Sequence, residues 1–170
     1  MKILVAGATG KTGRRLIGEL KSRGHYPIAL VRESSDTSTL SSDVELRYGD
    51  LTDKVDRDGA QRLVDIAVKS KVLRFVMLSS VGADKPDPEH KLAHYLQAKH
   101  YADEHLIASG LSYAIVRPVR LTDESGTRNM RFGDSVDVGG IAARGDVAAV
   151  LAEAVDDEKW DNKALTMQSI

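Results

Sequence analysis

The sequence predicts an α/β fold in which a mostly parallel, doubly wound sheet is covered by helices. Short apolar runs alternate along the chain with longer amphipathic segments. This alternation is typical of parallel strands joined by crossover helices. The 170 residues have the size of one domain, and the sequence contains no repeat, linker or low-complexity tract. We therefore predict a single domain over residues 1–170.

The predicted elements follow from apolar periodicity and from the residues at which each segment stops. Strands are expected at 2–6, 26–32, 44–48, 73–80, 112–118 and 163–168. Helices are expected at 11–23, 55–70, 91–110 and 144–157. The stretch GTRNMRFGD at 126–134 is either a lid over a substrate or a plain surface loop. In a sheet of this kind, ligands bind at the carboxyl ends of the strands.

Composition and charge exclude several functional classes. The formal net charge is −1, from 24 basic and 25 acidic residues, so no overall field favours nucleic acid or anionic lipid. The absence of cysteine excludes disulfides, zinc–thiolate sites and thiol catalysis. No apolar run reaches the length of a signal peptide core or a membrane span. We expect a cytoplasmic protein that binds a small molecule, without a metal, nucleic-acid or membrane partner. The sequence does not indicate an oligomer.

The stretch GATGKTG follows the first predicted strand and opens the first predicted helix. Gly7 permits a tight turn, Gly10 leaves space for a pyrophosphate, and Gly13 allows the helix to pack closely on the strand. Free N–H groups and the dipole at the helix start attract phosphates, and the two threonines add hydroxyl donors. The spacing is not that of a P-loop, because the first glycine lies too close to Gly-Lys-Thr. It predicts a dinucleotide site of the Rossmann type.

The second predicted strand ends in Arg32 and Glu33, where a side chain contacts the adenosine ribose in this kind of site. An acidic residue there holds the ribose hydroxyls of NAD, whereas an arginine suits the 2′-phosphate of NADP. Because Arg32 comes first, we predict NADP, and Glu33 leaves NAD open. The third strand runs into GDLTD, where Asp50 and Leu51 are candidates to flank the adenine.

The stretch YLQAK places Tyr95 and Lys99 at i and i+4 on one helix face. A tyrosine hydroxyl ordinarily titrates near 10, and a nearby ammonium favours its phenolate form, which suits general acid–base work. The same ammonium can hold the nicotinamide ribose. Ser80 ends a predicted strand, where its hydroxyl could steady a substrate carbonyl. The alternative for Tyr95 and Lys99 is an ordinary pair on an exposed helix.

These motifs resemble the short-chain dehydrogenase/reductase superfamily, and most of all its atypical, epimerase-like branch of NmrA-like and biliverdin reductase B-like proteins. The stretches that carry the resemblance span nearly the whole chain: GATGKTG, GDLTD, VDRDGAQRLVDIA, RFVMLSSVGAD, YLQAKHYADEHLIASGLSYAIVRP and GDVAAVLAEAV. The resemblance implies a catalytic group made of Ser80, Tyr95 and Lys99. It implies cofactor contacts at Gly7, Thr9, Gly10, Lys11, Thr12, Gly13, Arg32, Asp50, Leu51 and Pro118.

Two functions follow from this resemblance. The first is an NADP-dependent oxidoreductase or epimerase-like enzyme that acts on a small carbonyl or hydroxyl substrate. The second is a catalytically inactive NAD(P)-binding sensor or regulator. Both place the dinucleotide on the same glycine-rich turn, so they differ only in whether turnover occurs.

One part of the family pattern is absent between GDLTDK and VDRDGA. Members of the family carry a helix, the fourth strand of the sheet and a glycine-rich loop there, whereas here Lys54 runs directly into Val55. Either a segment is omitted, in which case these two residues would lie beyond the ~3.8 Å of bonded neighbours, or the chain truly lacks it. In the second case, the strand at 73–80 is expected beside the first strand.

Overall fold

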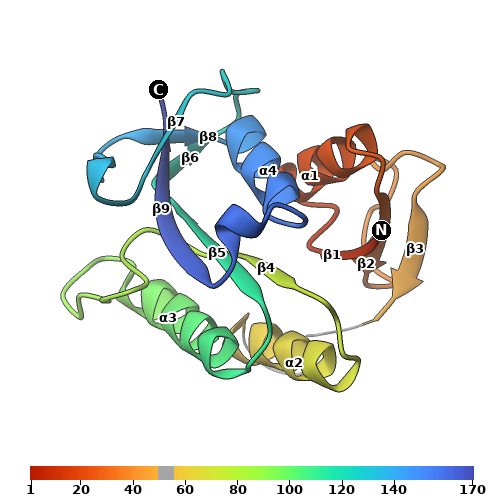
Figure 1. Ribbon diagram of the computed structural model, residues 1–170, viewed down its shortest axis with the longest axis horizontal. Helices are drawn as coiled ribbons and strands as arrows, with labels where there is room; N and C mark the ends of the chain where they lie inside the picture. Colours follow the sequence, from red (N-terminus) through yellow and green to blue (C-terminus); the bar gives the residue numbers. More distant parts are fainter. Residues whose placement is uncertain (50–55) are drawn as a thin grey trace.

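The computed structural model describes residues 1–49 and 56–170, and its elements follow the predicted alternation (Figure 1). The strands are β1 (Lys2–Ala6), β2 (Tyr26–Val31), β3 (Glu45–Tyr48), β4 (Phe75–Leu78), β5 (Tyr113–Pro118), β6 (Arg120–Thr122), β7 (Met130–Phe132), β8 (Ile141–Ala143) and β9 (Lys163–Ser169). The helices are α1 (Lys11–Ser22), α2 (Asp56–Lys69), α3 (Ala93–Ala108) and α4 (Arg144–Glu153), with 3-10 turns η1 (Gly133–Ser135) and η2 (Glu158–Trp160).

The described strands form three sheets. The first has the order β1-β2-β3 and is parallel throughout. The second has the order β4-β5-β9-β7, in which β7 alone is antiparallel to its neighbour. The third is the short parallel pair of β6 and β8. The predicted α/β class with a mostly parallel sheet is therefore confirmed.

Helices cover the strands from two sides. α1 packs against α4, and α2 packs against α3; Figure 1 shows the first pair above the strands and the second pair below them. The apolar core under α1 joins this helix to β1 and β2, and a second core joins α4 to β5 and β9. Leu16 of α1 packs against both cores. The third core lies between α2, α3, β4 and β5.

The sheet is interrupted between β1 and β4. Within the described residues, β1 is hydrogen-bonded only to β2, and β4 only to β5. The arrangement expected if the chain truly lacks the segment, with the strand at 73–80 beside the first strand, is therefore not found among the described residues. The interruption falls where the family resemblance puts the fourth strand. The junction of Lys54 and Val55 lies outside the described residues.

One face of the β1–β2 pair is also poorly covered. The side chains of Leu4 and Tyr26 lie on this face, because Lys2 is the register partner of Tyr26, and they are 51% and 71% exposed. The opposite face, with Val5 and Ala29, is buried under α1. Among the described residues, this half of the sheet therefore has a helix on one side only.

Three short strands lie where the sequence analysis assigns none. β6, β7 and β8 have three residues each, which is too short for an alternating pattern to be recognised. β7 falls inside 126–134 and pairs with β9. That stretch is thus partly the edge strand of a sheet rather than wholly a lid or a loop. No helix of the described chain combines the length and apolarity that a membrane span requires.

The turn from β1 into α1 depends on the smallest side chain at Gly13. A Cβ atom on Gly13 would lie 2.1 Å from the carbonyl oxygen of Gly7 and 2.9 Å from Cα of Ala8. The helix therefore begins in direct backbone contact with the end of β1, as the glycine spacing predicts. Gly18, in the same helix, has no atom within 4 Å of the corresponding position.

Gly13→Ala is expected to lower the free energy of unfolding of the ligand-free protein by about 1–3 kcal/mol, because backbone atoms cannot yield to the added methyl. Gly18→Ala is the matched control. It is expected to raise stability by up to about 1 kcal/mol through helix propensity. Urea denaturation of both variants measures the contrast, and equal effects would show that the close approach does not exist.

Candidate active site

The glycine-rich turn presents an uncapped helix start. Gly7 has φ +71, and the N–H of Gly10 donates to the Gly7 carbonyl at 3.0 Å, which closes the turn. Gly10 is the N-cap of α1 and offers no side-chain acceptor, and the first turn contains no acidic residue. The first N–H groups of a helix have no partner within the helix, so they are available to an anion. These features fit a dinucleotide diphosphate.

The remaining residues of the motif surround this turn. Thr9 and Thr12 are half-buried, and Lys11 is exposed as the first residue of α1. A Cβ atom on Gly10 would lie 3.2 Å from the Gly7 carbonyl oxygen, so a larger residue would crowd the turn. The structure thus brings the predicted phosphate-binding residues together at the carboxyl end of β1.

A pocket of about 360 Å³ lies at the ends of β2 and β3. It is lined by Arg32, Glu33, Ser34, Tyr48 and Gly49. The pocket is the expected place for the adenosine end of a dinucleotide, and it holds both the arginine and the acidic residue whose competition leaves NAD open. The two candidates to flank the adenine, Asp50 and Leu51, lie outside the described residues.

Ser80 and Pro118 are neighbours at the carboxyl ends of β4 and β5. The N–H of Ser79 donates to Val116 O at 2.8 Å, and the N–H of Val81 donates to Pro118 O at 3.0 Å. Ser80 therefore lies between two hydrogen bonds that fix its backbone against β5. Its side chain is half-buried, whereas Pro118 is buried.

Tyr95 and Lys99 lie together on α3, as their spacing predicts. The Lys99 Nζ is 5.7 Å from the centre of the Tyr95 ring. It also donates to the carbonyl oxygen of Leu78 at 3.1 Å, two residues before Ser80. The lysine thus connects the tyrosine to the end of β4, while the tyrosine is 47% exposed and accessible to a ligand.

A buried polar cluster, not predicted from the sequence, lies one turn beyond Lys99. The Oδ2 of Asp103 accepts hydrogen bonds of 2.9 Å from Ser79 Oγ and from Arg117 Nε. All three residues are buried, Asp103 completely, and its Oδ1 has no partner among the described atoms. The cluster joins α3, β4 and β5 immediately behind Ser80. The spacing of Asp103 four residues after Lys99 is a signal that could have revealed it.

Burial raises the pKa of Asp103 above its ordinary value. The hydrogen bonds from Ser79 and Arg117, and the charges of Arg117 and Lys99, act in the opposite direction. Desolvation has the larger effect because the carboxylate lies in the interior.

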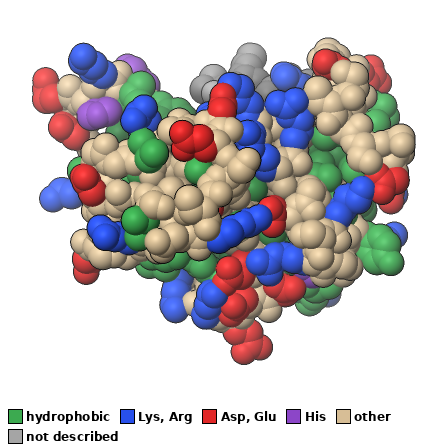
Figure 2. Space-filling view, turned by 90° about the horizontal axis from the view of Figure 1, so that it is seen from above, with side chains coloured by type: hydrophobic (Ala, Val, Ile, Leu, Met, Phe, Trp, Pro, Cys, Tyr) green, Lys and Arg blue, Asp and Glu red, His purple; other side chains and the backbone are tan. Residues whose placement is uncertain are grey.

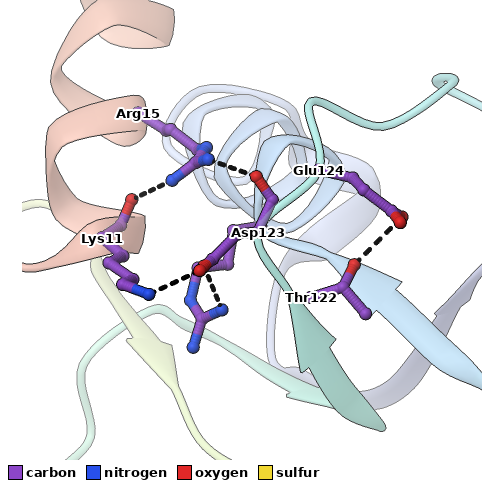
Figure 3. A network of polar contacts seen from close by, with 6 residues as sticks. Lys11, Arg15, Thr122, Asp123 and Glu124 are labelled. Atoms are coloured by element: carbon purple, nitrogen blue, oxygen red, sulfur yellow. Dashed lines mark hydrogen bonds and ion pairs between the residues drawn. The ribbon is translucent and has the colours of Figure 1, made fainter.

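A second group of charges, also not predicted from the sequence, lies beside the glycine-rich turn (Figure 3). Asp123 contacts Lys11 and Arg144 through its carboxylate and Arg15 through its carbonyl. These residues are distant in sequence, and the pairing of β6 with β8 brings Asp123 and Arg144 together. No local pattern could have shown this. The described residues contain no group of three or more side chains suited to hold a metal ion.

The stretch at 126–134 is held to the rest of the protein by polar contacts. The Arg128 side chain forms an ion pair with Glu19 of α1 at 2.5 Å. The backbone N–H of Arg128 donates to Asp146 Oδ1 at 2.8 Å. Asp146, fully buried at the start of α4, also accepts from Ser169 Oγ at 2.6 Å. These contacts anchor the chain that leads away from Asp123.

The fold and the site define the class of protein. An uncapped glycine-rich turn after β1, a pocket at the end of β2, and a Tyr-Lys pair beside the end of β4 characterise an atypical, NAD(P)-binding relative of the short-chain dehydrogenase/reductases. The sequence matches the profile of a family described as NAD(P)H-binding, over residues 7–58 and 52–158. The chain belongs to this NAD(P)H-binding family, which identifies a nicotinamide dinucleotide as its cofactor.

Several known proteins are similar to this chain over much of its length. The uncharacterized sugar epimerase YhfK of Bacillus subtilis is 29% identical over 201 aligned positions, which cover 98% of this chain and 94% of that protein. A solved structure from Bacillus halodurans, with the description "Putative NAD-dependent epimerase/dehydratase", has a TM-score of 0.90 and 31% identity, covering 100% of this chain and 94% of that one. Sanguinarine reductase of Eschscholzia californica is 31% identical over 71% of this chain and 47% of its own length.

The alignment with the Bacillus subtilis protein spans more positions than this chain has residues. The relative therefore carries residues without a counterpart here. The two stretches of the family match, 7–58 and 52–158, also overlap at residues 52–58. Both findings agree with the missing segment that the sequence analysis places between residues 54 and 55.

Asp103→Asn is expected to change how stability depends on pH. Because the folded state raises the pKa of Asp103, the folded protein binds this proton more tightly than the unfolded chain. Wild-type stability is therefore expected to fall relative to Asp103→Asn as the pH rises from about 4, the ordinary aspartate pKa, through the raised value. Urea denaturation across this range, with Asp84→Asn as an exposed charge-matched control, measures the trend. A difference that stays constant or moves in favour of the wild type would contradict it.

Proposed function

We propose that this protein is an NADP-dependent oxidoreductase or epimerase-like enzyme that acts on a small carbonyl or hydroxyl substrate. The observation that carries the proposal is the position of Lys99, which lies beside the Tyr95 ring and bonds the backbone at the end of β4. This contact places a cation, a phenol and the Ser80 segment at one end of the sheet. The names of the relatives, an epimerase and a reductase, support turnover. A regulator without turnover is not favoured.

Each side chain of the group has a distinct role in this proposal. Tyr95 exchanges a proton with the substrate oxygen, since its ring is accessible from solvent. Lys99 stabilises the phenolate form of Tyr95 by its charge. Ser80 donates a hydrogen bond to the same substrate oxygen and holds it in place. The bound cofactor supplies the hydride chemistry, and the protein orients it.

The choice of NADP rests on Arg32. Its backbone N–H donates to Ser35 Oγ at 3.1 Å, which fixes the turn after β2, and Arg32 lines the pocket together with Ser34. A guanidinium matches the geometry of a phosphate dianion. Glu33 shares this pocket, so the arginine must outweigh its charge for NADP to be preferred.

Tyr95→Phe is expected to reduce NADPH oxidation, measured over a panel of small carbonyl compounds, by about 10²–10⁴-fold, because it removes the proton-transferring group. NADPH binding, measured by calorimetric titration, is expected to stay unchanged. Tyr101→Phe serves as a control on the same helix, outside the proposed group. If both variants turn over at the wild-type rate, Tyr95 has no part in the chemistry.

Arg32→Ala is expected to weaken NADPH binding by about 10–100-fold through the loss of charge-assisted hydrogen bonds. NADH lacks the 2′-phosphate, so its affinity is expected to change little. Arg23→Ala, at the far end of α1, controls for the removal of one positive charge. Equal losses for NADPH and NADH in Arg32→Ala would refute the 2′-phosphate assignment.

A further inference from the structure

Asp123 meets three cations where the chain leaves β6. Its Oδ2 accepts from Lys11 Nζ at 2.5 Å, and its Oδ1 accepts from Arg144 Nη1 at 2.6 Å. Its carbonyl oxygen accepts from Arg15 Nη2 at 2.5 Å, and Arg15 Nη1 donates in turn to Lys11 O at 2.8 Å. Figure 3 shows Lys11 and Arg15 reaching from the first turns of α1 to Asp123. Both carboxylate oxygens and the backbone carbonyl oxygen of Asp123 thus accept a hydrogen bond from a cationic side chain.

The surroundings of Asp123 favour an anion more strongly than one carboxylate can satisfy. α1 begins at Lys11 and α4 begins at Arg144, and neither N-cap residue makes a side-chain capping hydrogen bond. The start of α1, which has no acidic residue in its first turn, therefore adds its positive end to three cationic side chains, whereas Asp146 already lies in the first turn of α4. The hydrogen bond from Lys11, followed by the charges of Lys11, Arg144 and Arg15, lowers the pKa of Asp123. Over the face of the molecule seen in Figure 2, acidic and basic side chains are interspersed.

The two carboxylate contacts differ in how easily they break. The side chains of Lys11 and Asp123 are 59% and 53% exposed, whereas that of Arg144 is 22% exposed. Exposed ion pairs contribute little because water and salt compete for both charges. Lys11 is also part of the glycine-rich turn that receives the diphosphate in the proposed function. It is the cation that can leave Asp123 at least cost, while Arg144 stays.

We propose that Asp123 is a built-in competitor of the dinucleotide: it occupies the anion site of Lys11, Arg15 and Arg144 and releases Lys11 to the incoming diphosphate. The proposal rests on the proposed function for the identity of the ligand. In this proposal, Asp123 weakens the affinity for the cofactor by competing for Lys11. Arg144 keeps its ion pair with the Asp123 carboxylate after Lys11 has moved.

The test uses a charge-matched neighbour. Asp123→Asn and Glu124→Gln each remove one negative charge, at adjacent exposed positions, but the Glu124 carboxylate accepts from Thr122 Oγ1 at 3.1 Å rather than from Lys11. Calorimetric titrations with NADP and with inorganic pyrophosphate compare the two. Asp123→Asn is expected to tighten binding of both by about two- to fivefold more than Glu124→Gln, the factor that an exposed ion pair is worth. Thermal melts check that both variants are folded.

The role of Lys11 is tested in the same way. In a Lys11→Gln background, Asp123→Asn is expected to tighten binding no more than Glu124→Gln does. Equal effects of Asp123→Asn and Glu124→Gln in the natural background, or a gain that persists without Lys11, would overturn the proposal. If the protein binds pyrophosphate but not NADP, the proposed function fails while the pyrophosphate comparison still decides the role of Asp123. Failure of every variant to bind either probe overturns both.

Discussion

The packing of α4 against both halves of the sheet is the constraint on which this fold depends. Within the described chain, no backbone hydrogen bonds join β1–β2–β3 to β4–β5–β9–β7. The helix layer makes the connection instead, since Val147 and Leu151 of α4 are buried against β5 and β9, while Ala152 belongs to the core of β1 and β2. Polar contacts reinforce it, including the bond of 3.1 Å between His25 and Asp156. Burial of apolar side chains thus holds the two groups of strands together, as hydrogen bonds between neighbouring strands do in an unbroken sheet.

This arrangement places the two ends of the proposed cofactor site on different halves of the sheet. The glycine-rich turn and Arg32 belong to the β1 half, and Ser80 and Lys99 belong to the β4 half. Hydride transfer requires reacting atoms about 3–3.5 Å apart, and a misplacement of about 1 Å costs orders of magnitude in rate. The α1–α4 contact therefore affects more than stability: in the proposed site, it would set the position of the cofactor relative to the groups that act on the substrate.

The sequence predicts the elements that carry a pattern and misses those that do not. The buried run of β5 and the proline that ends it, or the glycine after α3, determine local structure within a few residues, so these elements are found where they are expected. The glycine turn and the Tyr95-Lys99 pair are local for the same reason. Asp123 and Arg144 acquire their partners only through tertiary contacts that no spacing in the sequence encodes. The spacing from Lys99 to Asp103 places Asp103 on the same helix face, but its partners Ser79 and Arg117 also come from tertiary contacts. The interruption of the sheet beside β1 likewise depends on which strands pair with one another, and the sequence of a single strand does not specify its neighbours.

The two polar clusters differ in the property that matters for the site, which is access to water. Asp103 is fully buried, so breaking its bonds to Ser79 and Arg117 would leave a buried charge unpaired at a cost of several kcal/mol, about 3–5 for a typical pair. Asp123 is half exposed, so water can replace Lys11 at little cost. The end of β4 that carries Ser80 is therefore fixed before any ligand arrives, whereas the charges beside the glycine-rich turn can rearrange. A rigid side for the proposed catalytic group and an adjustable side for the proposed phosphate contacts suit a site split between two half-sheets. The dinucleotide contacts could then adapt without displacing the groups proposed to react.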